Sequence, residues 1–176
     1  MKIRHFIFII VAALSVAFTS CDLEGESNYT PFIILNFVKP VTQTNDSLEI
    51  FYTDQSNVFL LDTIQAGDTV TFRVGFNGFT NNLKAMYISQ SADSVTRIIL
   101  PNKLSMDSIF TTESDYAKGK FMMNGTTTFL YFPFRYVARS ASKEAKLTLT
   151  IVSDAVFEDG FGSNTTTMTL KTPIQP

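Results

Sequence analysis

The chain has 176 residues, with 14 lysines and arginines against 16 aspartates and glutamates, and a formal net charge of −2. This length predicts one modest globular domain, and the lack of a basic excess argues against a nucleic-acid-binding protein. The single histidine is His5, the single cysteine is Cys21, and there is no tryptophan. Beyond residue 20, therefore, no histidine is present to form a nucleophilic pair or to bind zinc, copper or iron.

The first residues are arranged like a bacterial secretory signal. Lys2 and Arg4 give a basic start, residues 6–18 form an apolar stretch, and two small residues precede Cys21. The apolar stretch is well short of the about 20 residues that span a bilayer, which favours a cleaved signal over a permanent anchor. We therefore predict a signal peptide over residues 1–20.

The sequence Phe-Thr-Ser-Cys that ends at Cys21 resembles the lipobox of bacterial lipoproteins, with Phe18 at the position where leucine is usual. The resemblance implies that Cys21 is lipidated, becomes the first residue of the mature protein and holds it to a membrane. A plain secreted protein cleaved nearby is the alternative. Removal of residues 1–20 takes away two basic residues and no acidic ones, so the mature chain has a net charge of about −4.

Residues 21–28 are expected to form a lipid-anchored tether, because residues 22–28 carry three acidic side chains and show no hydrophobic periodicity. Acidic residues just after the cysteine resemble the surface-export signal of Bacteroidota lipoproteins, although the adjacent acidic pair is absent. Asp22 directly after Cys21 instead resembles an inner-membrane retention signal of enterobacteria. The richness in Phe, Asn and Thr favours the first, and we expect an outer-membrane lipoprotein exposed at the cell surface.

From Pro31 onward, short apolar runs alternate with turn residues, and no stretch has a helical period. The clearest strand covers residues 70–76, where apolar side chains alternate with polar or small ones, as in a half-buried strand. Further strands are expected at residues 32–38, 48–52, 58–61, 84–89, 96–100, 119–123, 126–136, 146–152 and 165–171. One domain is expected over residues 29–176.

The dipeptide Asn124-Gly125 stands between two of these strands, at residues 119–123 and 126–136. Asn-Gly between apolar runs is the strongest short hairpin signal, because both central residues of a type I′ turn need a positive φ. We therefore predict that these two strands form a hairpin.

Residues 146–152 and 165–171 are expected to close the domain as an antiparallel pair, with the apolar side chains of the two strands in register. This pair resembles the last two strands of bacterial immunoglobulin-like domains, without an antibody-type Cys and Trp core. About eight to ten short strands with regular turns predict an all-β fold, a single immunoglobulin-like antiparallel β-sandwich. A lipocalin-like β-barrel is the alternative.

The densest aromatic run is FLYFPFRY, at residues 129–136. If its even-numbered residues enter the core, then Phe129, Tyr131 and Arg135 share the opposite face with Pro133. Proline cannot donate to a ladder, so this strand is expected at a sheet edge or with a bulge. Aromatic and arginine side chains are enriched in interface hot spots, which favours a binding face. A strand covered on both faces by loops is the alternative.

The loop between the last two strands carries Asp154, Glu158, Asp159 and Asn164. Calcium takes six to eight oxygens from such groups, but the spacing matches no EF-hand and Phe157 interrupts the polar run. We expect a solvated acidic loop without a bound cofactor, and calcium is the weaker alternative.

Five triplets consist of Asp, then Ser or Thr, then an apolar residue. The pattern resembles the Bacteroidota O-glycosylation sequon, which implies glycans on five hydroxyls. The alternative is that Asp-Ser or Asp-Thr closes a turn and the apolar residue opens a strand. Both interpretations place the hydroxyls on exposed turns. The implied acceptors are Ser47, Thr63, Thr69, Ser94 and Ser108.

Together these features predict a lipid-anchored module of the cell envelope that binds an unknown protein or glycan, without a cofactor. A structural subunit of a surface fibre, with residues 31–38 as a donor strand, and a glycan-binding lipoprotein of a polysaccharide-uptake system are the alternatives. An enzyme is not expected, because acid–base chemistry would fall to carboxylates, lysines or tyrosines in a domain with little room for a deep cleft. A hydrolase would need a carboxylate pair.

Overall fold

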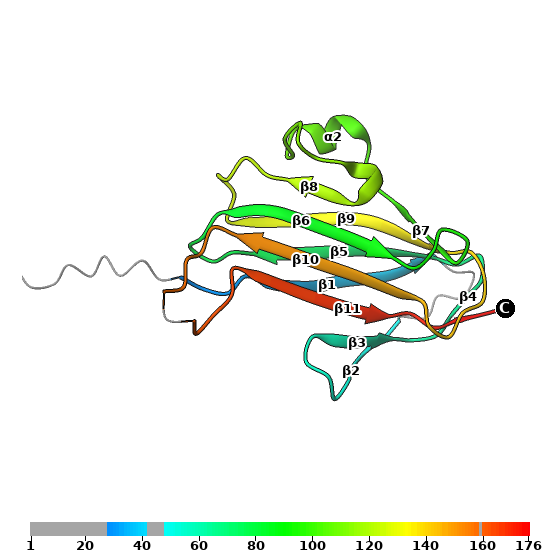
Figure 1. The fold of residues 1–176 in the computed structure, drawn as a ribbon. Coiled ribbons are helices and arrows are strands. Elements are labelled where there is room, and N and C mark those ends of the chain that lie inside the picture. The colour runs from blue at the N-terminus through cyan, green and yellow to red at the C-terminus, as the bar shows by residue number, and fades with distance from the viewer. Residues whose placement is uncertain (1–27, 42–47, 159) are drawn as a thin grey trace, which may run out of the picture.

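The structure is a computed structural model that describes residues 28–41, 48–158 and 160–176 and, in the first of these ranges, side chains up to residue 35. Cys21 and the predicted signal, Ser47 and Asp159 lie outside the described residues. The described chain is an all-β sandwich, as predicted, with two open sheets packed face to face (Figure 1).

The two sheets differ in size and in the order of their strands. The smaller has the order β1-β5-β9-β7, formed by β1 (Phe32–Val41), β5 (Thr69–Asn77), β9 (Phe129–Ala138) and β7 (Thr96–Ile99). The larger has the order β2-β3-β11-β10-β6-β8 and lies in front of the smaller in Figure 1. Its strands are β2 (Ile50–Tyr52), β3 (Val58–Leu61), β11 (Thr165–Lys171), β10 (Lys146–Ser153), β6 (Leu83–Gln90) and β8 (Lys120–Met122).

Three short elements complete the fold. Strands β4 (Ile64–Gln65) and β12 (Ile174–Gln175) form a small parallel pair, and a 3-10 turn, η1, covers Tyr116–Lys118. The helix α2 (Lys103–Asp107) was not expected, because five residues are too few to show a helical period. Its start is fixed by Asn102, whose side chain accepts a hydrogen bond from the Ser105 amide at 2.9 Å.

The core lies between the sheets and is rich in aromatic rings. On β5 the residues Val70, Phe72, Val74 and Phe76 are fully buried, which confirms the predicted alternation of this strand. Phe72 stacks on Phe134 of β9 with ring centroids 5.3 Å apart. Burial of each such side chain stabilises the fold by about 1.5–3 kcal/mol, so β5 and β9 are held as a rigid pair.

One hydrogen bond inside this core joins two buried hydroxyls. The hydroxyl oxygens of Tyr136 and Thr172 lie 2.6 Å apart, and both residues are fully buried. Burial raises the pKa of the Tyr136 phenol, and hydrogen bonds to Thr172 and Thr96 partly oppose that shift. The neutral phenol therefore ties β9 to the segment between β11 and β12.

One predicted pairing is confirmed. Strands β10 and β11 are antiparallel, with Leu147 opposite Leu170 and Leu149 opposite Met168.

The two sheets remain open, since no described strand joins one sheet to the other in a closed ladder. The lipocalin-like barrel is therefore wrong.

The predicted hairpin at Asn124-Gly125 is also wrong. Strand β8 pairs with β6 in the larger sheet, whereas β9 pairs with β5 and β7 in the smaller one. Only Gly125 has a positive φ, and the Asn124 side chain accepts hydrogen bonds from the amide and the hydroxyl of Thr126. The dipeptide thus begins a crossover between the two sheets instead of a type I′ turn.

The expected edge position of β9 is wrong for the strand as a whole, because β9 lies between β5 and β7. Its pairing with β5 is regular over nine positions, and Pro133 lies opposite Arg73 without a bulge. Strand β7, however, reaches only as far as Arg135. Among the described residues, Pro133 therefore has no strand on its β7 side, which is the environment that a proline needs.

Candidate functional site

The strand β9 places its predicted binding residues on the outer face of the smaller sheet. Its odd-numbered residues from 129 to 135 are exposed, and its even-numbered residues are buried. Phe129 is 37% exposed, Tyr131 is 51% exposed and Arg135 is exposed. The predicted alternation is thus confirmed, and a strand covered on both faces by loops is wrong.

The aromatic part of this face lies near the start of β9. The rings of Phe129 and Tyr131 meet edge to face, with centroids 4.6 Å apart. Across β5, Phe129 lies opposite Asn77, which in turn lies opposite the exposed Phe32 of β1. Tyr131 lies opposite Gly75, which has no side chain. Aromatic rings from β1 and β9 thus lie on either side of a stretch of β5 where Gly75 places no side chain on the outer face.

Three arginines cross the same face from β7 to β5. On β9, Arg135 lies two residues after Pro133 and two residues before Val137. Arg73 of β5 is paired with Pro133. Arg97 of β7 is paired with Val137. Arg97, Arg135 and Arg73 are therefore diagonal neighbours on adjacent strands, about 7–8 Å apart at their backbones. All three are exposed. We call Phe32, Phe129, Tyr131 and these three arginines the arginine-aromatic face.

No described acidic residue neutralises these arginines. All described aspartates and glutamates lie outside the strands. The ion pairs among the described residues are those of Lys84 with Asp154, Lys103 with Asp107 and Lys118 with Asp115. Like charges placed side by side in a sheet are destabilising. An acidic chain that nevertheless groups three arginines beside exposed aromatic rings presents a surface suited to an anionic partner.

The lysine pairs lower the pKa of two carboxylates in the segment between β7 and β8. A hydrogen bond from Lys103 lowers the pKa of Asp107, and one from Lys118 lowers the pKa of Asp115. Asp107 is exposed and Asp115 is half-buried. A general acid needs a raised pKa near the working pH, so these two groups are shifted in the opposite direction.

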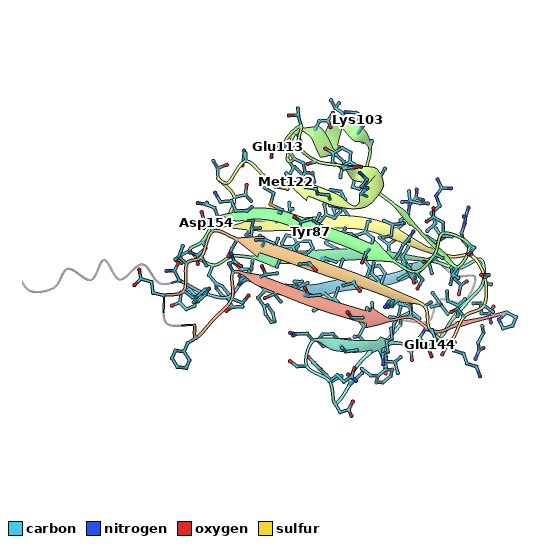
Figure 2. The ribbon with its side chains drawn as sticks, viewed as in Figure 1. Tyr87, Lys103, Glu113, Met122, Glu144 and Asp154 are labelled. Carbon is cyan, nitrogen blue, oxygen red and sulfur yellow. The ribbon has the colours of Figure 1, made fainter. Side chains whose placement is uncertain are left out.

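The outer face of the larger sheet has a different character. It carries a threonine ladder between β10 and β11, in which the hydroxyls of Thr150 and Thr167 lie 2.9 Å apart. Tyr87 on β6 is 39% exposed, and Figure 2 shows it on this sheet. Lys146 lies opposite Lys171, and both are exposed. This face therefore supplies matched control positions for Tyr131 and for the arginines.

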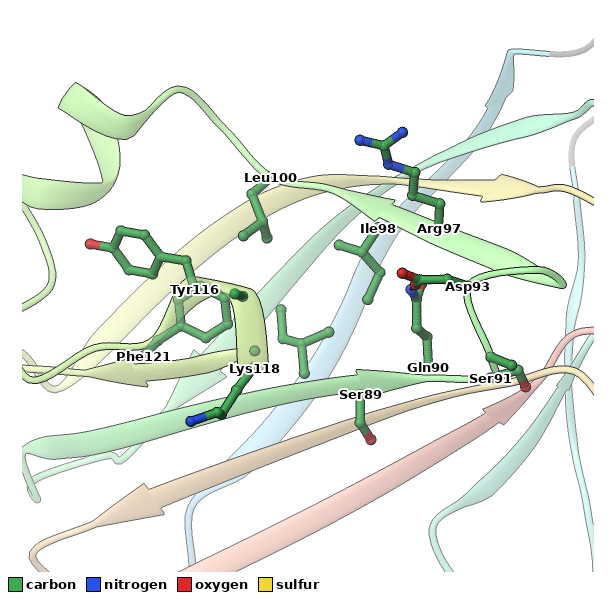
Figure 3. A pocket seen from close by; sticks show the side chains of 14 residues that line it. Ser89, Gln90, Ser91, Asp93, Arg97, Ile98, Leu100, Tyr116, Lys118 and Phe121 are labelled. Carbon is green, nitrogen blue, oxygen red and sulfur yellow. The ribbon is translucent and has the colours of Figure 1, made fainter.

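A cavity of about 470 Å³ lies beside the arginine-aromatic face, between β6, β7 and η1 (Figure 3). Arg97 and Ile98 leave β7 in opposite directions, so Ile98 belongs to the apolar floor while the Arg97 guanidinium points away. Gln90 on the rim donates to Asp93 at 2.8 Å, and its carbonyl oxygen is buried without a described partner. An apolar floor with one unpaired acceptor is an arrangement typical of small-molecule sites.

A second cavity, of about 430 Å³, lies at the opposite seam of the sandwich, next to the edge strand β1. It is lined mainly by apolar side chains from β1, β2, β3 and β11, among them Ile33, Ile50, Phe59 and Met168. The two sheets thus leave an apolar opening along this seam.

The loop considered for calcium has partners of its own. The Asp154 carboxylate accepts hydrogen bonds from the backbone amide and the side chain of Asn82. The Asn164 side chain accepts from the Thr165 hydroxyl at 2.9 Å, and Glu158 is exposed. Within the described ranges, which omit Asp159, no three His, Cys, Asp or Glu side chains form a group suited to a metal ion. Calcium binding remains a prediction without support from the described residues.

One described Asp-Ser/Thr triplet shows the hydrogen bonds of a turn, because Asp68 accepts from the Gln65 amide at 2.8 Å and its own amide donates to the Gln65 carbonyl. Asp62 instead accepts from the amide of Glu49, thirteen residues earlier, at 2.9 Å. The apolar residues that follow in these two triplets, Ile64 and Val70, are buried. Thr63, Ser94 and Ser108 are exposed and Thr69 is half-buried, so the described hydroxyls are open to solvent to different degrees. Glycosylation itself remains a prediction.

Comparison with models of protein families, with curated proteins and with solved structures gives no match. No helix in the described part of the chain is long and apolar enough to cross a membrane.

Proposed function

We propose that this protein is a non-catalytic, lipid-anchored binding or adaptor module of the bacterial cell envelope, with the arginine-aromatic face as its recognition surface. The observation that carries the proposal is the exposure of the Phe129 and Tyr131 rings on a regular strand, beside three arginines without a described acidic partner. Tyrosine and arginine are the residue types that dominate binding energy at interfaces. A contiguous exposed patch of this kind favours a binding role over a merely solvated surface.

The rigidity of the face supports this proposal. Strand β9 is paired with β5 over nine positions, and the core rings beneath it are closely packed. A partner therefore meets side chains whose backbone is already ordered, which lowers the entropic cost of binding. Arginine forks bind carboxylates, sulfates or phosphates in a bidentate geometry. The partner favoured by this chemistry is an anionic protein or glycan surface.

The membrane address of the module rests on Cys21. We expect Cys21→Ser to release the protein from the membrane fraction of native cells, whereas Ser20→Ala leaves it bound. Retention of the Cys21→Ser protein in membranes, still uncleaved, would contradict the anchor without touching the binding face.

The recognition surface is tested by paired variants of equal chemistry on the two outer faces. Arg73→Gln with Arg135→Gln removes two positive charges from the arginine-aromatic face, and Lys146→Gln with Lys171→Gln removes two from the larger sheet. The first pair of substitutions should raise the Kd for the partner tenfold or more, which corresponds to a loss of about 1.4 kcal/mol of binding free energy. The second pair should leave it unchanged. Equal losses in the two variants would refute the assignment of the face.

A structural role in a surface fibre is the second candidate, favoured by the apolar cavity of about 430 Å³ beside the edge strand β1. A strand from another copy would add at such an open seam. In this chain β1 is itself paired with β5 from Phe32 to Val41, so a donor role for it would require this ladder to open. Native protein extracted in detergent that ran only as a monomer would rule the fibre out.

A further inference from the structure

Six of the twelve exposed large apolar side chains in the described part of the chain lie at one end of the sandwich. This end comprises residues 28–32, the β5–β6 loop, the start of β9 and the β10–β11 loop. We call it the tether end, because the predicted lipid tether enters the domain there. Its exposed residues are Tyr29 at 49%, Phe79 at 46%, Val156 at 65% and Phe161 at 93%, together with Phe32 at 54% and Phe129 at 37%, which form the border with the arginine-aromatic face.

Hydrogen bonds join these segments into one surface. The side-chain oxygen of Asn28 accepts from the Asn81 side chain at 2.9 Å and from the Val156 amide at 3.3 Å. The Tyr29 amide donates to the Asn81 side chain, and the Ser163 amide donates to the Thr30 hydroxyl. The chain is thus fastened to the β5–β6 and β10–β11 loops from its first described residue onward.

The opposite end of the sandwich carries no such side chains in its described loops. Residues 66–68, 91–95 and 139–145 include no exposed large hydrophobic residue, and they carry Asp68, Asp93, Arg139, Lys143 and Glu144 instead. Single exposed apolar residues are normal on a protein surface, but the contrast between six at one end and none in the described loops of the other end points to a role for the first.

The loop between β5 and β6 holds its aromatic tip at a conformational cost. Phe79 has a φ of +58°, which is rare for a bulky residue. Its amide donates to the Asn77 side chain at 2.8 Å, and its ring meets Tyr29 with centroids 5.2 Å apart. The ring nevertheless remains nearly half exposed. Strain of this kind at an exposed tip is a pointer to function.

The length of the tether limits what this end can meet. If Cys21 carries the lipid, seven residue steps separate it from the first fastened residue, Asn28, and they reach at most about 25 Å. The tether end therefore stays close to the bilayer that holds the lipid. Tyrosine and phenylalanine rings partition well into the boundary between headgroups and acyl chains.

We propose that the tether end docks onto the bilayer interface, with Phe79 and Phe161 inserted as apolar tips, so that the sandwich stands upright on the membrane. This inference rests on the lipid anchor of the proposed function. The lipid holds the chain to the bilayer, and apolar side chains inserted beside it fix the orientation of the domain. In the upright position the strands of the arginine-aromatic face run away from the membrane, and the arginines lie farther out than Phe129.

The absence of tryptophan from the chain provides a clean optical test. Single Phe79→Trp, Phe161→Trp and Tyr52→Trp reporters are made in the full lipidated protein and reconstituted into vesicles of phosphatidylethanolamine and phosphatidylglycerol that contain brominated lipid. Tyr52 is the matched control, because it is an exposed aromatic residue, 88% accessible, on β2 of the larger sheet.

The Phe79 and Phe161 reporters should shift to shorter wavelength and lose fluorescence to bromine, whereas the Tyr52 reporter should do neither. Flotation with the vesicles shows separately that each protein is anchored. Anchored protein with all three reporters unquenched would overturn the docking and leave the proposed function intact, as for an end covered by another protein. Equal quenching of all three would also overturn it, because the orientation would then be random. Protein that fails to float would instead refute the lipid anchor.

Discussion

Removal of the buried hydroxyl of Tyr136 tests how the core supports β9. The Tyr136 and Thr172 hydroxyls are 2.6 Å apart in a site that excludes water. Tyr136→Phe leaves the Thr172 hydroxyl without this partner, and an unsatisfied buried polar group costs about 1–3 kcal/mol. A loss of about 2 kcal/mol lowers the melting temperature of a domain of this size by roughly 4–8 °C. Thr172→Val should cost less, about 1 kcal/mol, because Thr96 also hydrogen-bonds the phenol.

The double variant separates this mechanism from simple loss of packing. Replacement of both hydroxyls by apolar groups of the same shape is nearly neutral, so the pair should be coupled by about 0.5–3 kcal/mol in urea unfolding of the Cys21→Ser protein. Strict additivity of the two single losses would refute the buried hydrogen bond.

The same phenol predicts a dependence on alkaline pH. Burial holds the folded pKa of Tyr136 above its ordinary value of 10.0. Its contribution to stability is therefore complete below pH 10 and is lost as the pH rises through the raised folded pKa, since the unfolded chain ionises first. Tyr136→Phe should remove this part of the alkaline decline, and an unchanged decline in the variant would contradict the cause given for the shift.

Three further predictions concern a turn glycine, the Lys103–Asp107 ion pair and the loop considered for calcium. Gly119→Ala should lower the free energy of unfolding in urea by at least about 1–2 kcal/mol. Gly119 has a φ of +66°, and a Cβ there would lie 2.0 Å from a β6 carbonyl oxygen. Gly67→Ala is the control and should cost less, because the space around Gly67 is open. Because the pKa of Asp107 is lowered in the folded state, its contribution to stability is present above pH 3.8 and is lost as the pH falls through the folded pKa. Asp107→Asn should therefore make the melting temperature depend less on pH in the acid range. An unchanged acid dependence would argue against the Lys103–Asp107 pair. Because Asn82 already occupies the Asp154 carboxylate, EDTA should leave the melting temperature unchanged, and a clear fall would restore the calcium site.

The local alternation of single strands could be predicted from the sequence. The period of two on β5 and β9 fixed which side chains enter the core, and thereby which of Phe129, Tyr131 and Arg135 point outward. These are local properties, because successive residues of a strand must point to opposite faces. The antiparallel pair β10 and β11 was predictable for the same reason, since adjacent strands along the chain commonly pair.

The pairing of distant strands could not be predicted in this way. The Asn124-Gly125 signal concerns only the turn, whereas the choice of β6 as the partner of β8 depends on contacts more than thirty residues away. The grouping of the three arginines of the arginine-aromatic face could not be predicted for the same reason. Arg73 and Arg97 are each unremarkable in their own strands, and only the order β5-β9-β7 brings them beside Arg135.

We propose that the outer face of the smaller sheet contacts the partner, and a photocrosslinker placed in that face tests this contact. p-Benzoylphenylalanine is substituted for Tyr131 or, as the matched control, for Tyr87 on the outer face of the larger sheet, and intact cells are irradiated. The account predicts a discrete adduct from position 131 that disappears when Arg73 and Arg135 are changed to Gln, and no such adduct from position 87. An adduct from position 87 alone, or from both positions regardless of the arginines, would contradict the account.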